Sequence, residues 1–519
     1  MTSVPTGEPL KGAQVYLTAP EKYKALYRAE TDTTGGFSIE NVEPGTYQLK
    51  ADKTGYYDPA RGCDSADIQS GDVIKLAPGQ RLSEIKLQLS ASAVITGTVF
   101  NPKGEPLPDA DVEAVQLYSY RGQRTLGNAV SPKTTNDRGE FRIYHLQPGK
   151  YFVRVSDAFY FRNESDVEED DPAARQVKGF LPIYYPDTSE LTQATIIELK
   201  PGEELAQINF TVHLTQVLRI RGSVVSGLTG EPITNGSVAI GLVPPAIREN
   251  GGGAMSIAED SHFEVKDLVP GKYIVSAHAW VVPERRVLGG WRQIELTDSS
   301  LDDVQIRVFP SQDITGRVEL PGGKKIEAGH LQIQLDPHDD LVYGSAFTNV
   351  KADGTFIIPD VKQDSYDLGL SGLPDGYYLK SAALGTLDAT DGLRVGVEAI
   401  TVPLVIHVSP SGAKVDGVVM TGTGKPACSA TVVLVPDGSR RSRRRLYQEA
   451  DVDRSGHFEM LGIVPGDYKL FAFDHAENVG YMDAGSLSVY ANQGQAVHFD
   501  EGDRRTVPLK VILTGSGSP

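Results

Sequence analysis

The sequence predicts an all-β protein built from five tandem β-sandwich domains. A Pro-Gly-x-Tyr phrase recurs and ends at Tyr47, Tyr151, Tyr273 and Tyr468, with a degenerate copy at Tyr366. A short apolar segment with a glycine in a fixed place precedes each of the later copies, and helical periodicity is negligible. Self-similarity at a period of roughly 100 residues indicates whole domains in series rather than small repeats.

The repeated phrase predicts two strands and two turns. In the copy at 137–155, the first turn contains a glycine that can adopt positive φ, and the second is a Pro-Gly corner. In the first strand, alternation leaves open whether Phe141 and Ile143 or Tyr144 or His145 take the buried face. In the second strand it places Tyr151, Val153 and Val155 on one face. A two-stranded ribbon is marginal alone, so it must bury this face against a second sheet.

The remaining segments supply that second sheet. Strands with the fixed glycine read ITGTVF from 95, IRGSVV from 220, ITGRVE from 314 and VDGVVM from 415. Strand–turn–strand patterns follow at 72–89, 195–214 and 496–513. About seven strands per unit indicate a sandwich. The predicted domains are 1–92, 93–216 with an acidic insertion, 217–311, 312–411 (divergent) and 412–519.

The first domain starts at the turn that follows the first strand in later copies, "TGEPLKGAQV". We therefore expect it to be truncated at its N-terminal strand, with that strand and a secretion signal encoded upstream. Few joints exceed about five residues, so hinge motion between domains should be limited. The sequence leaves open whether the domains are collinear or folded back.

The composition of the chain argues against some classes of function. The net charge of −18 argues against a general nucleic-acid binder, which needs a basic face. No run of 18 apolar residues is present, so no helix is expected to cross a membrane. Cys63 and Cys428 are far apart in the chain and fall in different predicted domains, so no disulfide is expected between them.

The sequence contains only weak matches to known catalytic and metal-binding motifs. The one HxxE pair, His498 and Glu501, lies near the C-terminal end with no later histidine to complete a zinc site. Asp451, Asp453 and Ser455 have the alternate spacing of a calcium loop, but position twelve is Gly462, so a hairpin turn is the better interpretation. We predict no catalytic residues, no metal site and no cofactor, with one open alternative, calcium on the acidic segment 163–172.

Three groups of residues could bind a partner. An arginine run, Arg440, Arg441, Arg443, Arg444 and Arg445, could grip an anionic glycan, lipid headgroup or acidic protein, or could be a charged hairpin tip. Trp280 and Trp291 could form a platform for sugar rings or pack a loop base, and Tyr184 and Tyr185 leave the same choice open.

The pattern "ITGTV … GEPLPDADV … TNDRGEFRI … QPGKYFVRV" resembles the carboxypeptidase regulatory-like domain, an Ig-like, transthyretin-like (prealbumin-like) sandwich, and is similar to the collagen-adhesin B-type module. The resemblance implies a non-catalytic bacterial protein of the cell envelope or secreted space, acting as spacer, scaffold or adhesion-type binder. Alternatives are an accessory carbohydrate-binding protein and a calcium-stiffened stalk. The expected partner is a polysaccharide or an envelope protein, and the expected location is periplasmic, cell-surface or secreted.

Overall fold

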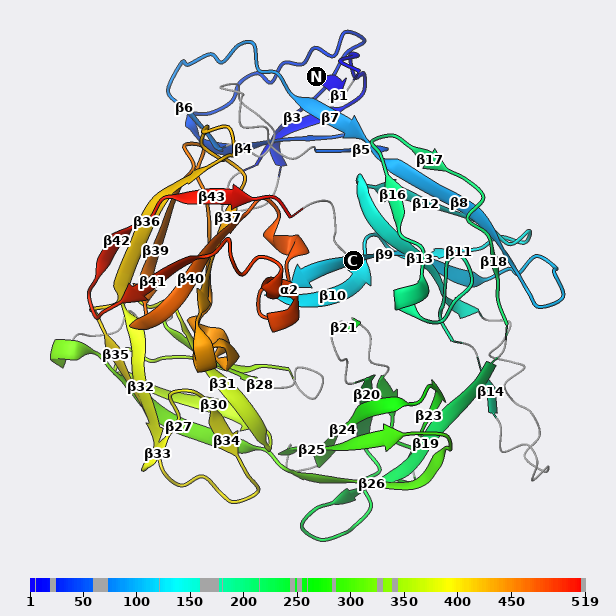
Figure 1. Ribbon diagram of the computed structural model, residues 1–519, viewed down its shortest axis with the longest axis vertical. Coiled ribbons are helices and arrows are strands. Elements are labelled where there is room, and N and C mark those ends of the chain that lie inside the picture. The colour runs from blue at the N-terminus through cyan, green and yellow to red at the C-terminus, as the bar shows by residue number, and fades with distance from the viewer. Residues whose placement is uncertain are drawn as a thin grey trace.

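The protein is described by a computed structural model in which strands dominate (Figure 1). The structure describes residues 1–4, 6–18, 25–58, 73–120, 122–158, 177–179, 181–213, 215–242, 248–249, 254–258, 260–281, 286–323, 330–337 and 344–514. The all-β prediction is confirmed. Within these residues the α-helical content is the single short α2 (Ala484–Ser488), accompanied by short 3-10 helices. We use the predicted divisions of the chain as names, units 1 to 5.

Units 1 and 2 each contain two sheets. Unit 1 pairs β1-β7-β5 and β3-β2-β4-β6. Its strands are β1 (Thr2–Val4), β2 (Gln14–Thr18), β3 (Ala25–Glu30), β4 (Gly45–Asp52), β5 (Tyr56–Tyr57), β6 (Val73–Leu76) and β7 (Gln88–Ala91). The elements of unit 2 are β8 (Ala93–Phe100), β9 (Ala110–Tyr120), β10 (Gln123–Asn128), β11 (Lys133–Thr134), β12 (Glu140–Leu146), β13 (Gly149–Ala158), β14 (Val177–Gly179), β15 (Ile183–Tyr184), η1 (Leu191–Gln193), β16 (Ile197–Leu199), β17 (Glu204–Leu205) and β18 (Phe210–Thr211).

Unit 4 also contains two sheets, whereas most strands of unit 3 are linked into one eight-stranded sheet that includes β14. Unit 3 comprises β19 (Thr215–Ser226), β20 (Gly236–Leu242), β21 (Arg248–Glu249), β22 (Ala254–Ser256), β23 (His262–Leu268), β24 (Gly271–Val281), β25 (Arg286–Leu296) and β26 (Leu301–Pro310). Unit 4 comprises β27 (Gln312–Glu319), η2 (Pro321–Gly323), β28 (Gln332–Pro337), β29 (Ala346–Asn349), β30 (Thr355–Val361), β31 (Asp364–Ser371), β32 (Tyr378–Leu384), β33 (Leu387–Asp388), β34 (Leu393–Val395) and β35 (Leu404–Ser409). Its sheets run β30-β27-β35-β32-β33 and β29-β28-β31-β34.

Unit 5 adds helical turns to the strand plan. Its elements are β36 (Ala413–Met420), β37 (Thr431–Pro436), η3 (Gly438–Ser442), η4 (Arg444–Leu446), β38 (Gln448–Asp451), β39 (His457–Ile463), β40 (Gly466–Phe473), η5 (Ala476–Asn478), α2, β41 (Gln495–Phe499), β42 (Arg504–Thr506) and β43 (Leu509–Ile512). Each of the five units surrounds its own cluster of buried apolar side chains, and unit 5 has a second cluster beneath η5 and α2. Separate cores of this kind are what a series of sandwiches requires.

The repeated phrase forms the predicted ribbon. In unit 2, Tyr151, Val153 and Val155 of β13 are buried, as the alternation predicts. In β12 the buried face is made by Phe141 and Ile143, which the sequence left open. The pairing of β12 with β8 shifts register after Ile143, and His145 in the shifted segment has φ of 65°. This bulge moves Leu146 onto the buried face, which strict alternation would not have done.

The tyrosine of the phrase is explained by a hydrogen bond. In every unit its hydroxyl donates to the backbone carbonyl four residues earlier, across the Pro-Gly corner or its equivalent. The donors and acceptors are Tyr47 and Glu43 (2.8 Å), Tyr151 and Gln147 (2.6 Å), Tyr273 and Val269 (2.8 Å), Tyr366 and Lys362 (2.9 Å), and Tyr468 and Val464 (2.8 Å). Burial raises the pKa of Tyr151 to about 12, so the hydroxyl keeps the proton that it donates. Each bond stabilises its corner by about 1 kcal/mol.

The fixed glycine is explained by two close neighbours. It lies directly opposite a phenylalanine on the adjacent strand, in the pairs Gly97–Phe141, Gly222–Phe263, Gly316–Phe356 and Gly417–Phe458. A Cβ atom there would also meet the carbonyl oxygen of a third strand or segment, at 1.8 Å from Ile208, 2.0 Å from Val304, 2.2 Å from Leu404 and 2.0 Å from Val507. The position therefore has no room for a side chain.

The first strand of unit 1 is shortened rather than missing. Thr2 forms a bridge with Pro9, as Phe100 does with Pro106 in unit 2, and β1 pairs in parallel with β7. β1 spans three residues where β8 spans eight. The prediction that unit 1 lacks its first strand is therefore wrong, because β1 lies in the place of that strand.

The prediction that the cysteines stay unlinked is wrong for the one that the structure describes. Cys428, in the turn before β37, is disulfide-bonded. Cys63, the other cysteine of the sequence, lies outside the described residues. The expectation rested on separation along the chain, which says little once the units fold back on one another.

The units fold back into a closed circuit. Figure 1 shows them arranged around a common centre, where the α2 segment faces β10. β10 pairs with β21, which joins units 2 and 3, and aspartates of unit 4 bind arginines of unit 5. The circuit closes because Met482 N donates to Gly122 O at 2.9 Å, which joins unit 5 to unit 2.

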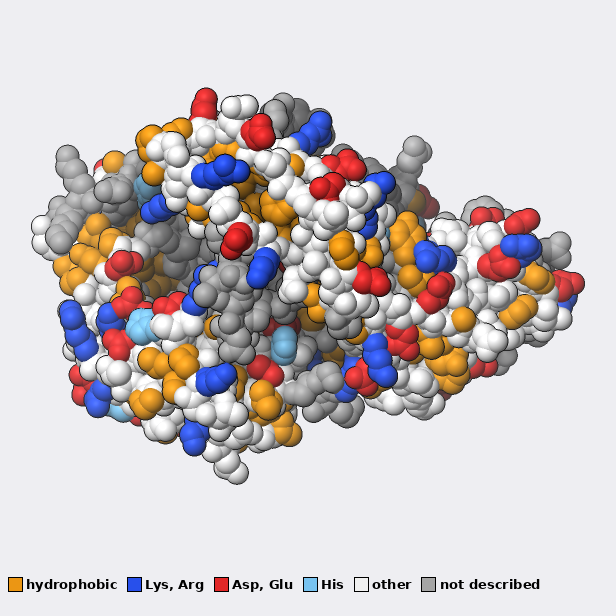
Figure 2. All heavy atoms as spheres, turned by 90° about the horizontal axis from the view of Figure 1, so that it is seen from above, with side chains coloured by type: hydrophobic (Ala, Val, Ile, Leu, Met, Phe, Trp, Pro, Cys, Tyr) orange, Lys and Arg blue, Asp and Glu red, His pale blue; other side chains and the backbone are white. Residues whose placement is uncertain are grey.

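The described surface is mixed in charge. Figure 2 shows acidic and basic side chains interspersed over the face seen from above, without a continuous basic area on that face. No helix among the described residues has the length and hydropathy needed to span a membrane.

Candidate functional site

A groove between units 3 and 4 is the leading candidate site. Its volume is about 580 Å³, within the usual range of ligand-binding sites. Unit 3 contributes side chains of β25 and β26, and unit 4 contributes the corner before β31 and the end of β34. The lining residues are Gly290, Trp291, Arg292, Gln305, Arg307, Phe309, Gln363, Asp364, Ser365, Arg394, Val395 and Gly396.

The groove has its shape because two strands of unit 3 separate from each other. β25 and β26 are paired only at Leu288–Pro310 and Gly289–Phe309. Gly290 permits the close approach there, since a Cβ atom would lie 1.9 Å from the Arg307 carbonyl oxygen. Beyond this point the strands are unpaired, and the side chains of Trp291 and Arg307 are exposed.

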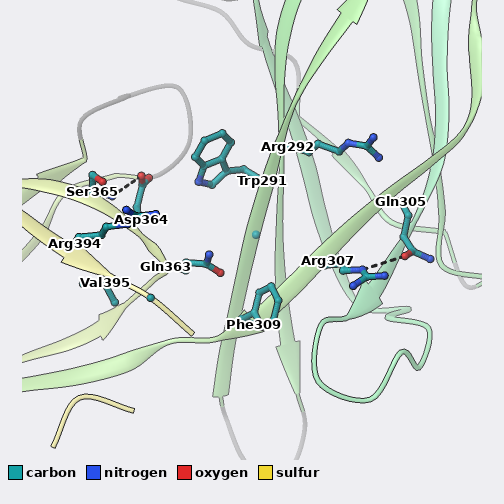
Figure 3. Close-up of a pocket in the computed structure, with 12 residues that line it drawn as sticks. Trp291, Arg292, Gln305, Arg307, Phe309, Gln363, Asp364, Ser365, Arg394 and Val395 are labelled. Atoms are coloured by element: carbon teal, nitrogen blue, oxygen red, sulfur yellow. Dashed lines mark hydrogen bonds between the residues drawn. The ribbon is translucent and has the colours of Figure 1, made fainter. Parts of the chain in front are cut away.

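The groove has an aromatic middle and polar ends. Figure 3 shows Ser365, Asp364 and Arg394 on one side and Arg292, Gln305 and Arg307 on the other, with Trp291, Gln363 and Phe309 between them. Trp291 is 41% exposed, although its ring is among the largest apolar groups of the chain. The Ser365 backbone N–H donates to Asp364 Oδ1 at 2.7 Å, and Arg307 Nε donates to Gln305 Oε1 at 3.3 Å.

The second tryptophan lies elsewhere on the same sheet. Trp280, on β24 opposite Val287 of β25, is 50% exposed and is not among the residues that line the groove. Tyr184 is buried, and its hydroxyl accepts a hydrogen bond from Arg154 at 3.0 Å. Tyr185 is half-buried against Phe210 at a ring distance of 6.0 Å. The two tyrosines therefore serve packing, whereas both tryptophans are exposed.

The arginine run joins units 4 and 5. It forms η3 and η4 instead of a simple hairpin tip. Arg443 and Arg445 bind the two oxygens of Asp391 at 2.8 and 2.9 Å, and Arg444 lies 3.8 Å from Asp367. These contacts account for three of the charges within the molecule.

The other two arginines of the run are held within unit 5. The Arg440 guanidinium lies 5.1 Å from the ring centre of Tyr468, and Arg441 donates to the Tyr481 carbonyl at 3.3 Å. Binding of an anionic partner by the arginine run remains a prediction. Most of the arginines in the run already contact other groups of the protein.

The HxxE residues have separate roles. His498 Nδ1 lies 2.7 Å from Asp467 Oδ1, which raises the pKa of the imidazole. Glu501 instead reaches into unit 4, where its Oε1 accepts hydrogen bonds from Ser409 (2.7 Å), Tyr378 (3.1 Å) and Lys380 (3.2 Å). These donors hold the pKa of the Glu501 carboxyl below its ordinary value.

We expect the Glu501 contact to weaken in acid. Because the folded-state pKa is lowered, its contribution is complete above the ordinary value of 4.5 and is lost as the pH falls through the lowered value. The melting temperatures of wild type and Glu501→Gln should therefore differ at pH 7 and converge toward pH 3. A constant difference between the two proteins over this pH range would contradict the assignment.

The calcium-loop-like residues close a turn. Asp453 Oδ1 accepts hydrogen bonds from Ser455 N (2.8 Å), His457 N (2.9 Å) and Ser455 Oγ (2.7 Å), which lower its pKa. Asp32 in unit 1 accepts equivalent bonds from Thr34 N and Gly36 N at 2.8 and 2.9 Å. Their oxygens hold the hairpin, as the turn interpretation predicts. The acidic segment 163–172 lies outside the described residues.

The sequence pointed to Trp291 but not to its neighbours in the groove. Phe309 and Arg394 come from segments 85 residues apart in the numbering and meet only because units 3 and 4 are packed together. Neither has a local motif. Only a prediction of the angle between the two units could have found them.

Comparison with known proteins identifies part of the chain. The carboxypeptidase regulatory-like domain matches residues 2–89 and 94–177, in units 1 and 2, which together are about a third of the sequence. These segments are two tandem copies of that domain. No curated protein matches the chain.

Solved structures with some similarity include pilins. A streptococcal ancillary pilin is 12% identical with a TM-score of 0.22, and the match covers 62% of this chain and 99% of the pilin. The shaft pilin SpaA from Lactobacillus rhamnosus GG is 11% identical (TM-score 0.18, covering 43% and 98%). BcpA, the major pilin subunit of Bacillus cereus, is 9% identical (TM-score 0.16, covering 81% and 99%). Identities and scores this low transfer no function to this chain.

Proposed function

Starting from two tandem carboxypeptidase regulatory-like domains at its N-terminal end, we propose that this chain is a non-catalytic structural and interaction protein of the bacterial cell envelope or secreted space. It acts as a scaffold that presents surface loops and grooves to a polysaccharide or an envelope protein. The observation that supports this most is how the ionisable motifs are used. Arg443, Arg445 and Glu501 bind the neighbouring unit, and Asp453 closes a turn.

Two further features support the proposal. Contacts close units 2 to 5 into a circuit, which favours a rigid frame over a flexible string of modules. Cys428 is disulfide-bonded, and disulfides persist mainly outside the reducing cytosol, which supports a periplasmic, surface or secreted location.

The test is binding and turnover of the full chain. We expect it to be retained on arrays of envelope polysaccharides or envelope proteins, and to show no hydrolysis of peptide or glycoside substrates. Hydrolysis by the pure protein would contradict the non-catalytic part of the proposal. Absence of retention on every polysaccharide and protein would contradict the interaction part.

A second candidate, accessory carbohydrate binding, is favoured by the exposed Trp291 ring in the groove. A third, a calcium-stiffened stalk using the acidic segment 163–172, is tested by comparing the melting temperature in calcium with that in chelator. An unchanged temperature would reject it.

A further inference from the structure

We propose that the groove between units 3 and 4 binds an acidic carbohydrate, a chain of sugars that carry carboxylate groups, with Trp291 as the stacking platform and arginines at both ends as the carboxylate-binding groups. This inference rests on the carbohydrate-binding function proposed above and names its ligand class. It uses residues from both units, so the site exists only in the assembled frame.

The charge of the groove favours an acidic ligand. The groove contains Arg292, Arg307 and Arg394 against one acid, Asp364, whereas the whole chain has a net charge of −18. Within the part of the chain that the structure describes, none of these three arginines forms an ion pair with a carboxylate. The arginine run of unit 5 differs in this respect, because aspartates of unit 4 already bind it.

The choice of arginine specifies the ligand further. A guanidinium group is planar and offers paired N–H donors that match the two oxygens of a carboxylate. Arg292 and Arg394 are exposed at opposite sides of the groove, so one compact anion cannot meet both (Figure 3). An extended ligand with repeated carboxylates can.

The aromatic middle of the groove favours a sugar ligand. The Trp291 ring lies between the two arginine groups, and half-buried Phe309 also lines the middle of the groove (Figure 3). A flat exposed indole offers a face to the apolar side of a sugar ring, while Gln305, Gln363 and Ser365 can hydrogen-bond to hydroxyl groups.

An acidic peptide would also satisfy the arginines, but a sugar chain fits the whole lining better. A polyglutamate chain has no flat face for Trp291 to cover. Nucleic acid is disfavoured because the rest of the acidic chain would repel its phosphates. The expected ligand is therefore a carbohydrate, and an acidic peptide is tested beside it.

The experiment measures binding of the full chain to three probes by isothermal titration calorimetry. The probes are an oligogalacturonate, a neutral galactan oligosaccharide of the same length, and a polyglutamate of similar charge. We expect the oligogalacturonate to bind at least 10-fold more tightly than either other probe. Its affinity should fall as salt is raised from 0.05 to 0.5 M, because exposed charges are screened.

Variants place the ligand in the groove. Trp291→Ala and Arg394→Gln should each weaken oligogalacturonate binding at least 10-fold. Trp280→Ala is the matched control, because it removes the same ring from the neighbouring strand outside the groove, and should leave binding unchanged. All three residues are exposed, so the melting temperature should stay near that of wild type and separate loss of binding from loss of fold.

The outcomes are distinguishable. Equal affinity for the neutral and acidic probes, both lost in Trp291→Ala, would keep carbohydrate binding and overturn the acidic ligand. Polyglutamate binding as tight as oligogalacturonate binding would overturn the carbohydrate. No binding of either sugar, or equal losses in Trp280→Ala and Trp291→Ala, would overturn the site and with it the carbohydrate-binding candidate.

Discussion

Replacing Gly417 by alanine will lower the free energy of unfolding of unit 5 by about 3 kcal/mol. The new methyl group would lie 2.0 Å from the Val507 carbonyl oxygen and 2.9 Å from the Phe458 ring. A carbonyl in the backbone cannot swing aside as a flexible side chain can, so β36 must separate from the segment that precedes β43. The parallel pairing of β36 with β42 and β43 should weaken as a result.

The matched control is Gly422→Ala in the same unit. Gly422 has no heavy atom within 4 Å of the added methyl group and no positive φ, so the change should be neutral or slightly stabilising. Thermal melts, and hydrogen exchange of peptides from residues 413–512, would measure both variants. Equal behaviour of the two alanine variants would show that the fixed glycine is not there to make room.

The same glycine shows how far sequence reasoning reaches. Its recurrence at 97, 222, 316 and 417 predicted a strand with a special position, and the Pro-Gly-x-Tyr phrase predicted the corner beside it. Both features act within one unit, between segments close in the chain or in a repeated register. Repetition therefore exposes them, and the degenerate copy at Tyr366 keeps the same hydroxyl-to-carbonyl bond at 2.9 Å.

Contacts between units could not be predicted from the sequence in this way. Asp391 and Arg445 are 54 residues apart, and Gly122 and Met482 are still farther apart. Each such contact occurs once, so no repeat reveals it. The arginine run illustrates the limit, since its charge was evident in the sequence but its aspartate partners were not.

Replacing Tyr481 by alanine will open the circuit of units. Tyr481 is 3% exposed, packs beside Tyr447 at a ring distance of 6.1 Å, and donates its hydroxyl proton to Glu449. Burial and the carboxylate raise its pKa, so the phenol remains a donor across the physiological pH range. Loss of a buried aromatic ring of this size costs about 3–5 kcal/mol.

Removal of the Tyr481 ring should weaken the contact between unit 5 and unit 2. A Cβ atom added to Gly122 would lie 2.4 Å from the Tyr481 ring. The next residue, Met482, donates its N–H to the Gly122 carbonyl at 2.9 Å. Without the ring, the segment that carries η5 and α2 no longer holds this backbone in place. We expect a larger radius of gyration by small-angle scattering, and faster amide exchange at residues 122–128.

Two further variants isolate the contact from general damage to unit 5. Gly122→Ala should enlarge the molecule in the same way from the unit 2 side. Its methyl group would meet the Tyr481 ring, and the φ of 77° at this position disfavours alanine. Tyr490→Ala removes a ring from the same segment that packs on Phe473 within unit 5, at a ring distance of 5.3 Å. It should lower the melting temperature without enlarging the molecule. If Gly122→Ala and Tyr481→Ala both keep the wild-type radius, units 2 and 5 do not hold each other, and the frame must owe its closure to the other joints.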